Sequence, residues 1–197
     1  MIIDVNQNIP IIGSVKGVNV WSMTTNFDSR GRLFKASTGA DSEVFPIPFN
    51  THEHFFTESK KHVFRGMHFQ GFPHEVSKVI SIVQGKAMDF LFDMREKSPT
   101  YGNLQIVELN QVEPKSIFIP TGVAHGYLAL EEKTIISYRM DRSFCFKCDS
   151  GFSAEIVSDF LPIDLSETIQ SKRDIEMPKY ENFKFSSECK LGEIPKL

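Results

Sequence analysis

Residues 78–94, KVISIVQGKAMDFLFDM, hold two short apolar runs on either side of the turn signal Gln84-Gly85. Similar runs follow along the chain, separated by short polar segments: Gln105–Leu109, Ser116–Ile119, Tyr127–Leu130 and Thr134–Met140. These runs are rich in Ile, Val, Phe and Tyr, and they lack the i, i+3, i+4 apolar spacing of an amphipathic helix. Because short runs at this spacing are typical of a sandwich or barrel, we predict an all-β fold from about residue 15 to residue 140.

The chain changes character after Asp149, where it becomes polar and is interrupted by prolines. We predict that this segment wraps around the barrel as irregular chain and short helix, and that residues 186–197 form a flexible tail. A length of 197 residues favours one domain, which we place at residues 1–185. A short helix is also predicted at Ser42–Phe45.

The composition is that of an ordinary globular protein, with 41% hydrophobic residues, 24% charged residues and a net charge of −3. The 18 Phe and the low net charge exclude a disordered chain, and the near-neutral balance argues against nucleic acid as a partner. No stretch approaches the roughly 20 apolar residues of a membrane span, and Asp4 stands where a signal peptide would carry positive charge. We therefore expect a cytoplasmic protein without a membrane partner.

The three cysteines, Cys145, Cys148 and Cys189, are too few for a disulfide framework and are expected to be reduced. Cys145 and Cys148 form a Cys-x-x-Cys pattern, which occurs in zinc sites and in redox pairs. The chain has no second such pair and no thioredoxin-like context. Incidental thiols near a strand end are therefore the favoured interpretation.

The densest chemical segment is residues 64–70, FRGMHFQ, followed by residues 73–78, PHEVSK. It combines a cation, an imidazole, an amide and a lysine immediately before a predicted strand. Because alternate residues of a strand share a face, we expect His68 and Gln70 to point one way and Arg65 the other. Taken alone, a histidine in this Phe-rich setting is as often a hydrogen-bonded core residue as a functional one.

Two further segments carry polar side chains at strand ends. Residues 120–127, PTGVAHGY, hold His125 between small residues, an arrangement that serves a structural turn as often as a cavity wall. Residues 137–141, SYRMD, place Tyr138 at the end of an apolar strand, where a tyrosine more often packs than reacts. Each signal is weak by itself, but their order along the chain is informative.

Taken in order, these segments resemble the dTDP-4-dehydrorhamnose 3,5-epimerase family over roughly residues 20–180. The matching segments are Asp28–Gly31, Arg65–Gln70, Pro73–Lys78, Asp93–Arg95, Ser98–Gly102, Ile119–Tyr127, Ser137–Arg139 and Ser171–Asp174. The resemblance implies a double-stranded β-helix, the cupin-type jelly roll, in a homodimer that exchanges N-terminal strands. It also implies a nucleotide-diphospho-4-keto-6-deoxy sugar as substrate, inverted at C3, C5 or both, with no metal and no other cofactor. The pathway implied is deoxysugar or surface-polysaccharide biosynthesis.

The resemblance also implies catalytic roles that can be compared with the chemistry. Removing a proton beside a ketone requires a base and a stabilised enolate. His68 matches the family base, as suits an imidazole that titrates near neutral pH, and Asp174 matches the carboxylate that orients it. Lys78 matches the cation near the keto oxygen, and Tyr138 matches the acid on the opposite sugar face. Without the resemblance, Asp174 in its polar segment would be interpreted as solvated surface.

The remaining matches concern substrate binding. Arg30 and Arg65 match arginines that bind the diphosphate, a task suited to the guanidinium fork. His125 and Gln70 match positions that line the sugar pocket. Ser59 matches a residue of the family motif that lies just before the strand with His68.

Departures from the family pattern leave the specificity open. Lys35 stands where an acidic residue is expected near the nucleotide base, and residues 152–156 replace a segment that contains Trp. An epimerase acting at one centre, or a 3,4-ketoisomerase on the same fold, are therefore alternatives.

Two rivals come from other functional classes. One is a metal-dependent cupin, whose ligands would be His68, His74, Glu75 and His125. Metal cupins usually carry a tighter His-x-His cluster, whereas His68 and His74 are six positions apart. The other is a non-catalytic protein that binds sugar nucleotides, against which the retention of all four catalytic matches argues.

Overall fold

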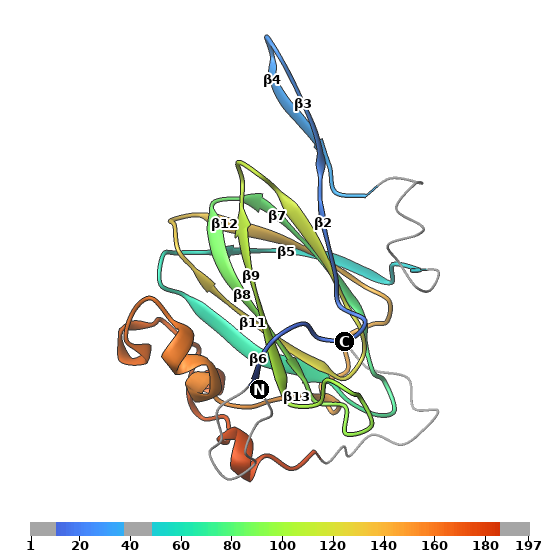
Figure 1. The fold of residues 1–197 in the computed structure, drawn as a ribbon, viewed down its shortest axis with the longest axis vertical. Coiled ribbons are helices and arrows are strands. Elements are labelled where there is room, and N and C mark those ends of the chain that lie inside the picture. The colour runs from blue at the N-terminus through green and yellow to red at the C-terminus, as the bar shows by residue number, and fades with distance from the viewer. Residues whose placement is uncertain (1–10, 38–48, 186–197) are drawn as a thin grey trace.

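Two β-sheets packed face to face form the body of the protein (Figure 1), in a computed structural model that describes residues 11–37 and 49–185. The predicted all-β fold is confirmed. The helix predicted at Ser42–Phe45 and the tail predicted at residues 186–197 lie outside the described residues. Within the described part of the chain, no helix has the length and apolar character needed to cross a membrane.

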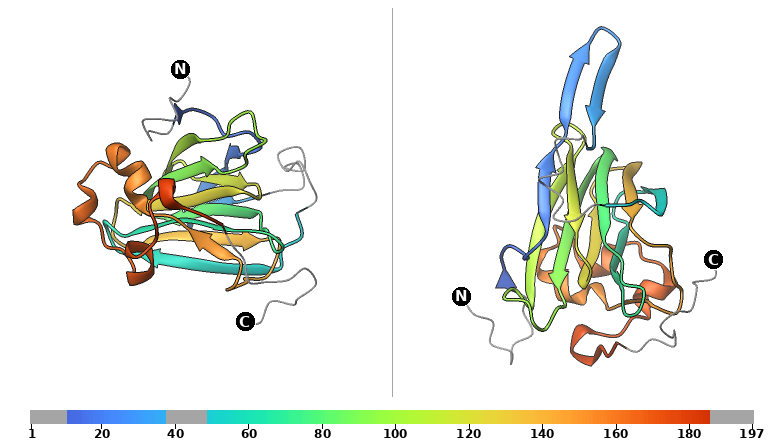
Figure 2. Two further views of the ribbon diagram at one scale, coloured as in Figure 1. Left: turned by 90° about the horizontal axis from the view of Figure 1, so that it is seen from below. Right: turned by 90° about the vertical axis from the view of Figure 1, so that its right-hand side faces the viewer.

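The first sheet has six strands in the order β1 (Ile11–Ile12), β9 (Asn103–Asn110), β8 (Lys86–Asp93), β11 (Val123–Ala129), β6 (Phe64–Gln70) and β13 (Asp149–Gly151). The second has five strands in the order β2 (Asn19–Ser22), β10 (Lys115–Ile119), β7 (Lys78–Gln84), β12 (Thr134–Met140) and β5 (Glu53–Ser59). All neighbours pair antiparallel except β1 and β9. A separate hairpin, β3 (Thr24–Asp28) and β4 (Gly31–Lys35), extends beyond the two sheets (Figures 1 and 2).

Strand β8 is buried on both faces. Leu91 belongs to a core between the sheets, where it joins Ile80 of β7 and Ile117 of β10. Phe90 and Phe92 belong to a second core on the outer face of the six-stranded sheet. A strand covered on both sides reads as a continuous apolar run rather than as an alternating one, which explains the sequence AMDFLFDM.

The C-terminal segment covers that outer face with short helices, as predicted. They are η2 (Ala154–Phe160), η3 (Leu165–Glu167), α1 (Lys172–Ile175) and η4 (Tyr180–Asn182), drawn in orange to red in Figure 1. Val157 is fully buried in the second core, and Tyr180 and Phe183 pack against it. The scattered apolar residues of the C-terminal segment therefore anchor this otherwise polar segment to the sheet. The anchoring brings Asp174 to the body of the fold.

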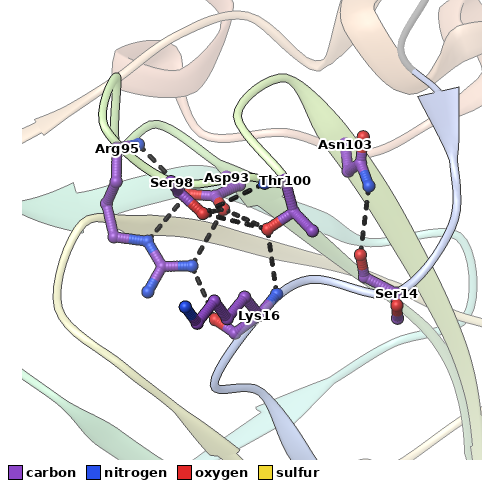
Figure 3. Close-up of polar contacts among 7 residues, drawn as sticks. All are labelled: Ser14, Lys16, Asp93, Arg95, Ser98, Thr100 and Asn103. Carbon is purple, nitrogen blue, oxygen red and sulfur yellow. Dashed lines mark hydrogen bonds and ion pairs between the residues drawn. The ribbon is translucent and has the colours of Figure 1, made fainter. Parts of the chain in front are cut away.

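A buried carboxylate organises the connection between β8 and β9 (Figure 3). Asp93 is fully buried and accepts hydrogen bonds from Arg95 Nε at 2.7 Å and from the hydroxyls of Ser98 and Thr100, both at 2.6 Å. The same group holds the N-terminal segment, because Arg95 Nη2 donates to the Lys16 carbonyl oxygen at 2.6 Å. Burial raises the pKa of Asp93, but these hydrogen bonds outweigh it and the pKa lies below its ordinary value. The Ser-Pro-Thr turn therefore serves the fold.

Replacing Asp93 by alanine is expected to lower the free energy of unfolding by about 3 kcal/mol. This is the low end of the cost of breaking a buried ion pair, because Arg95 remains partly solvated. Since the pKa is lowered on folding, the stabilisation is present above the unfolded-state value near pH 4 and is lost as the pH falls through the folded-state value. Urea unfolding measures the change. Asp28→Ala, which removes an exposed partner of Arg30, is the control and should change stability little; an equal loss in both variants would contradict the argument.

Candidate active site

A cavity of about 520 Å³ is lined by residues of both sheets and of the C-terminal segment. Its volume lies within the range of small-molecule sites. Residues of β5, β6, β7, β11, β12 and α1 contribute side chains to its wall. His68, Lys78, Tyr138, Asp174, Arg65 and His125, all predicted as site residues, line it together.

His68 and Asp174 form a hydrogen-bonded pair, although they lie 106 positions apart in sequence. His68 Nε2 donates to Asp174 Oδ1 at 2.7 Å, with Asp174 buried and the His68 side chain about a quarter exposed. Asp174 is held in place because its backbone N–H donates to the hydroxyl of Ser171, the N-cap of α1. Burial raises the pKa of Asp174, but His68, Ser171 and Arg173 together lower it further, so the carboxylate stays ionised near neutral pH. An ionised carboxylate fixes the imidazole orientation and stabilises its protonated form.

Lys78 brings a buried amine next to this pair. It lies at the start of β7, and its Nζ donates to the carbonyl oxygen of His68 at 3.4 Å. Burial lowers the pKa of Lys78 to about 8, with the charges of Asp149 and Asp89 opposing that shift. A cation that is mostly protonated at pH 7 and poorly solvated is suited to stabilise an oxyanion formed in the cavity.

Tyr138 lies on another strand, β12, and is buried against Phe55. Their rings stack with centroids 5.1 Å apart and planes 3° from parallel. Burial raises the pKa of Tyr138 well above its ordinary value, and the charges of Tyr127 and Asp89 raise it further. The phenol is therefore protonated near neutral pH and can act as a proton donor.

A second imidazole–carboxylate pair lies deeper in the sheet. His125 Nε2 donates to Asp89 Oδ2 at 2.8 Å, and both side chains are buried. The other oxygen, Asp89 Oδ1, has no hydrogen-bond partner among the described residues. Burial raises the pKa of Asp89, and His125 and Lys78 oppose that shift. Nothing in the sequence alone identified Asp89 as the partner of His125.

The predicted alternation along β6 is wrong, because the strand contains a bulge. His68 is paired with His125 and Arg65 with Tyr127. An interval of three residues on β6 therefore lies opposite an interval of two residues on β11. The extra residue brings Arg65 and His68 to the same cavity. The close contact requires glycine, since a Cβ on Gly66 would lie 2.4 Å from Cα of Gly126, and Gly66 has a φ of +137°.

Ser59 lies behind Arg65 rather than in the cavity wall. Arg65 Nε donates to Ser59 Oγ at 3.0 Å, and Ser59 also bonds with the hydroxyl of Tyr127 at 2.8 Å. Thr57 bonds with the same hydroxyl at 2.9 Å and does line the cavity. Ser59 therefore positions the Arg65 guanidinium. Thr57 is a cavity residue that the sequence analysis did not predict.

Two further predicted binding residues, Gln70 and Arg30, also do not line the cavity of this chain. The Gln70 side chain turns to the loop after β12, where its Oε1 accepts from the backbone N–H of Cys145 at 2.8 Å. Arg30 lies at the turn of the β3–β4 hairpin, almost fully exposed and paired with Asp28. The pairing of β6 with β13 is regular from His68 to Gln70, so the hydrogen bond to the loop, rather than the bulge, accounts for the position of the Gln70 side chain. Arg30 does not reach the cavity because its hairpin extends away from the sheets.

The sequence also missed an ion pair at the rim. Arg173 Nη2 lies 2.6 Å from Asp149 Oδ2, and both residues line the cavity. This contact ties α1 to β13, and so helps to hold Asp174 beside His68. Arg173 could have been suspected from its position next to Asp174, whereas nothing in the sequence marked Asp149.

The ligand set of a metal-dependent cupin is not assembled. His68 is paired with Asp174, and His125 with Asp89. Within residues 11–37 and 49–185, the one group of three metal-ligating side chains joins His74 to Cys145 and Cys148. His74 therefore belongs to a different cluster from His68.

Comparisons with known proteins point to one family. The sequence profile of a family described as dTDP-4-dehydrorhamnose 3,5-epimerase matches residues 13–182. A curated Mycobacterium tuberculosis protein of that name is 28% identical over 167 residues, which cover 83% of each chain. A dTDP-4-dehydrorhamnose 3-epimerase from Streptomyces niveus is 28% identical over 97 residues, covering 49% of this chain and 47% of its own.

The fold is likewise shared with solved structures. The crystal structure of dTDP-4-dehydrorhamnose 3,5-epimerase from Sulfolobus tokodaii superposes with a TM-score of 0.77 at 29% identity, covering 86% of this chain and 94% of that one. The predicted cupin-type jelly roll is therefore confirmed.

Proposed function

The chain belongs to the dTDP-4-dehydrorhamnose 3,5-epimerase family, and from that membership we propose that it is an isomerase acting on a nucleotide-diphospho-4-keto-6-deoxy sugar. It inverts C3, C5 or both, in deoxysugar biosynthesis. The observation that carries the proposal is the hydrogen-bonded pair of His68 and Asp174 in one cavity with Lys78 and Tyr138.

The reaction begins with the removal of a proton beside the C4 ketone. Because Nε2 of His68 donates to Asp174, Nδ1 is the basic nitrogen and accepts that proton. The imidazolium that forms is stabilised by the ionised carboxylate of Asp174. Negative charge then develops on the ketone oxygen, and the Lys78 ammonium stabilises it.

Inversion requires a proton to return from the other side of the sugar ring. Tyr138 lies on the five-stranded sheet and His68 on the six-stranded sheet, so a ring between them meets one side chain on each face. The high pKa of the buried phenol keeps its proton available for this step. Arg65, supported by Ser59, is a cation available for the diphosphate.

Incubation with nucleotide-linked 4-keto-6-deoxyhexoses in deuterium oxide, followed by NMR of the ring protons, tests the function. Deuterium at C3 and C5 indicates a double epimerase, and deuterium at one carbon indicates a single-centre enzyme such as the 3-epimerase named for Streptomyces niveus. A carbonyl moved from C4 to C3 would identify a ketoisomerase instead. Exchange with none of the dTDP-, CDP-, GDP- or UDP-linked sugars would contradict an epimerase.

The Lys78 amine should make the reaction sensitive to alkaline pH. Because burial lowers its pKa to about 8, the ammonium loses its proton as the pH rises through that value, and kcat/KM should fall with it. A profile of kcat/KM against pH reports the free enzyme, and so reports this group before substrate binds. Lys78→Arg retains charge above pH 8 and should remove the alkaline fall, even if its activity is lower. A wild-type profile that is flat through pH 8 would contradict the assignment.

We also propose a homodimer in the cytoplasm, where nucleotide sugars are made. The β3–β4 hairpin supports the homodimer, because it extends from the body (Figure 2) and exposes two large apolar side chains. Phe27 is 74% exposed and Leu33 is 55% exposed. Docking of this hairpin on a second copy would bring Arg30 to the partner's cavity. Light scattering of the purified chain tests the dimer, and a monomer at assay concentration would contradict it.

A further inference from the structure

Three metal-ligating side chains meet between the β6–β7 loop and the β12–β13 loop. They are His74 from the first loop and Cys145 and Cys148 from the second, and their ligand atoms all lie within 4.8 Å of one another. Both cysteines are almost completely buried, and His74 is half-buried. This combination of two thiols and one imidazole is typical of zinc sites.

The nitrogen–sulfur distance in the cluster fits a metal ion, and the sulfur–sulfur distance lies between those of a zinc site and of a disulfide bond. The bond lengths of tetrahedral zinc imply about 3.5 Å between a ligating nitrogen and sulfur, and about 3.8 Å between two sulfurs. His74 Nδ1 lies 3.4 Å from Cys148 Sγ, and the two sulfurs lie 3.0 Å apart. A small side-chain rotation would bring the two sulfurs to the spacing of a zinc site, whereas the sulfurs of a disulfide bond are about 2.05 Å apart.

The backbone around the cluster is already organised. Gln70 connects the two loops, since its Nε2 donates to the His74 carbonyl oxygen and its Oε1 accepts from the Cys145 N–H. The N–H groups of Cys148 and Asp149 both donate to the Cys145 carbonyl oxygen, at 2.9 and 2.8 Å. Outer-shell contacts of this kind fix the orientation of metal ligands. They also give Gln70 a role that differs from the predicted one.

We propose that His74, Cys145 and Cys148 bind a structural zinc ion. The ion would join the loop that leads into β7 to the loop that leads into β13, and these strands begin at Lys78 and Asp149 of the cavity. Zinc therefore stabilises one wall of the active site without taking part in the reaction. The site is distinct from the His68–Asp174 pair, and it does not depend on the proposed function.

The described residues supply three ligands, and water completes the four-coordinate shell.

Elemental analysis of the full chain, purified without chelator and again after reconstitution with zinc, tests the proposal. We expect one zinc per chain. Cys148→Ser and His74→Ala should each weaken zinc binding by at least about 100-fold, the upper end of the loss caused by removing an outer-shell partner. His52→Asn, which changes an exposed histidine elsewhere, is the matched control and should keep the ion.

Cobalt substitution gives a second measurement, independent of activity, for variants that fold poorly. Wild type should show a thiolate-to-cobalt charge-transfer band, reduced in Cys148→Ser and unchanged in His52→Asn. Metal content no higher than in the cysteine variants, or a mass lower by two hydrogens from a Cys145–Cys148 disulfide, would overturn the proposal.

Discussion

Replacing His68 by asparagine is expected to lower the rate of deuterium incorporation at the inverted carbon by about 10³- to 10⁴-fold. General base catalysis contributes up to about this factor, and the amide of asparagine cannot accept the proton at neutral pH. Asparagine retains an N–H that can donate toward Asp174, and the side chain lies at the cavity wall rather than in either core. The loss should therefore be one of chemistry, with the fold intact. NMR of the substrate in deuterium oxide measures it.

A matched histidine controls for the substitution itself. His52→Asn changes an exposed residue before β5 and should exchange deuterium at the wild-type rate. The thermal unfolding midpoint of His68→Asn should stay close to that of wild type, which separates lost catalysis from lost structure. Exchange by folded His68→Asn at a rate near that of wild type would show that another group is the base.

The strands of the body could be predicted because each is short, apolar and bounded by a turn. Thr134–Met140 coincides with β12, and the two runs around Gln84-Gly85 correspond to β7 and β8. The start of β11 was missed, since its small residues resemble a turn in sequence. The β3–β4 hairpin was missed for a different reason, because its residues are largely exposed and carry little apolar signal.

The partners within the site could not be predicted from local sequence. Alternation along a strand assumes a regular ladder, but the bulge in β6 depends on the contact of Gly66 with Gly126, which is distant in sequence. The pairing of His125 with Asp89 likewise depends on the register between β11 and β8. The family resemblance supplied His68 and Asp174 together, whereas a polar segment alone would have left Asp174 on the surface.

The metal-ligating cluster shows the same limit. Cys145 and Cys148 were visible as a pair, but their third member, His74, is in another loop 74 positions before Cys148. Only the pairing of β6 with β13 brings these loops together. The sequence therefore favoured incidental thiols, and Gln70 was assigned to the cavity although it joins the two loops.

Replacing Tyr138 by phenylalanine is expected to separate proton removal from inversion. The variant loses only the phenolic oxygen and keeps the ring stacked on Phe55, so the cavity wall should be preserved. His68 can still remove the proton and return solvent deuterium on its own side, and washout of the substrate hydrogen should continue. Formation of the inverted product should fall by about 10²- to 10⁴-fold, because no acid remains on the opposite face. NMR in deuterium oxide reports both rates in one sample.

The ratio of washout to inversion is the decisive quantity in this experiment, since a general loss of binding or stability lowers both rates together. Tyr101→Phe removes the hydroxyl of a half-exposed tyrosine that bonds only with Tyr180 among the contacts described, and the ratio should stay at its wild-type value. If washout and inversion fall equally in Tyr138→Phe, the phenol does not donate the proton and Tyr138 has a structural role. If washout persists while inversion is lost, His68 and Tyr138 act on opposite faces of the sugar, as their places on the two sheets lead us to expect.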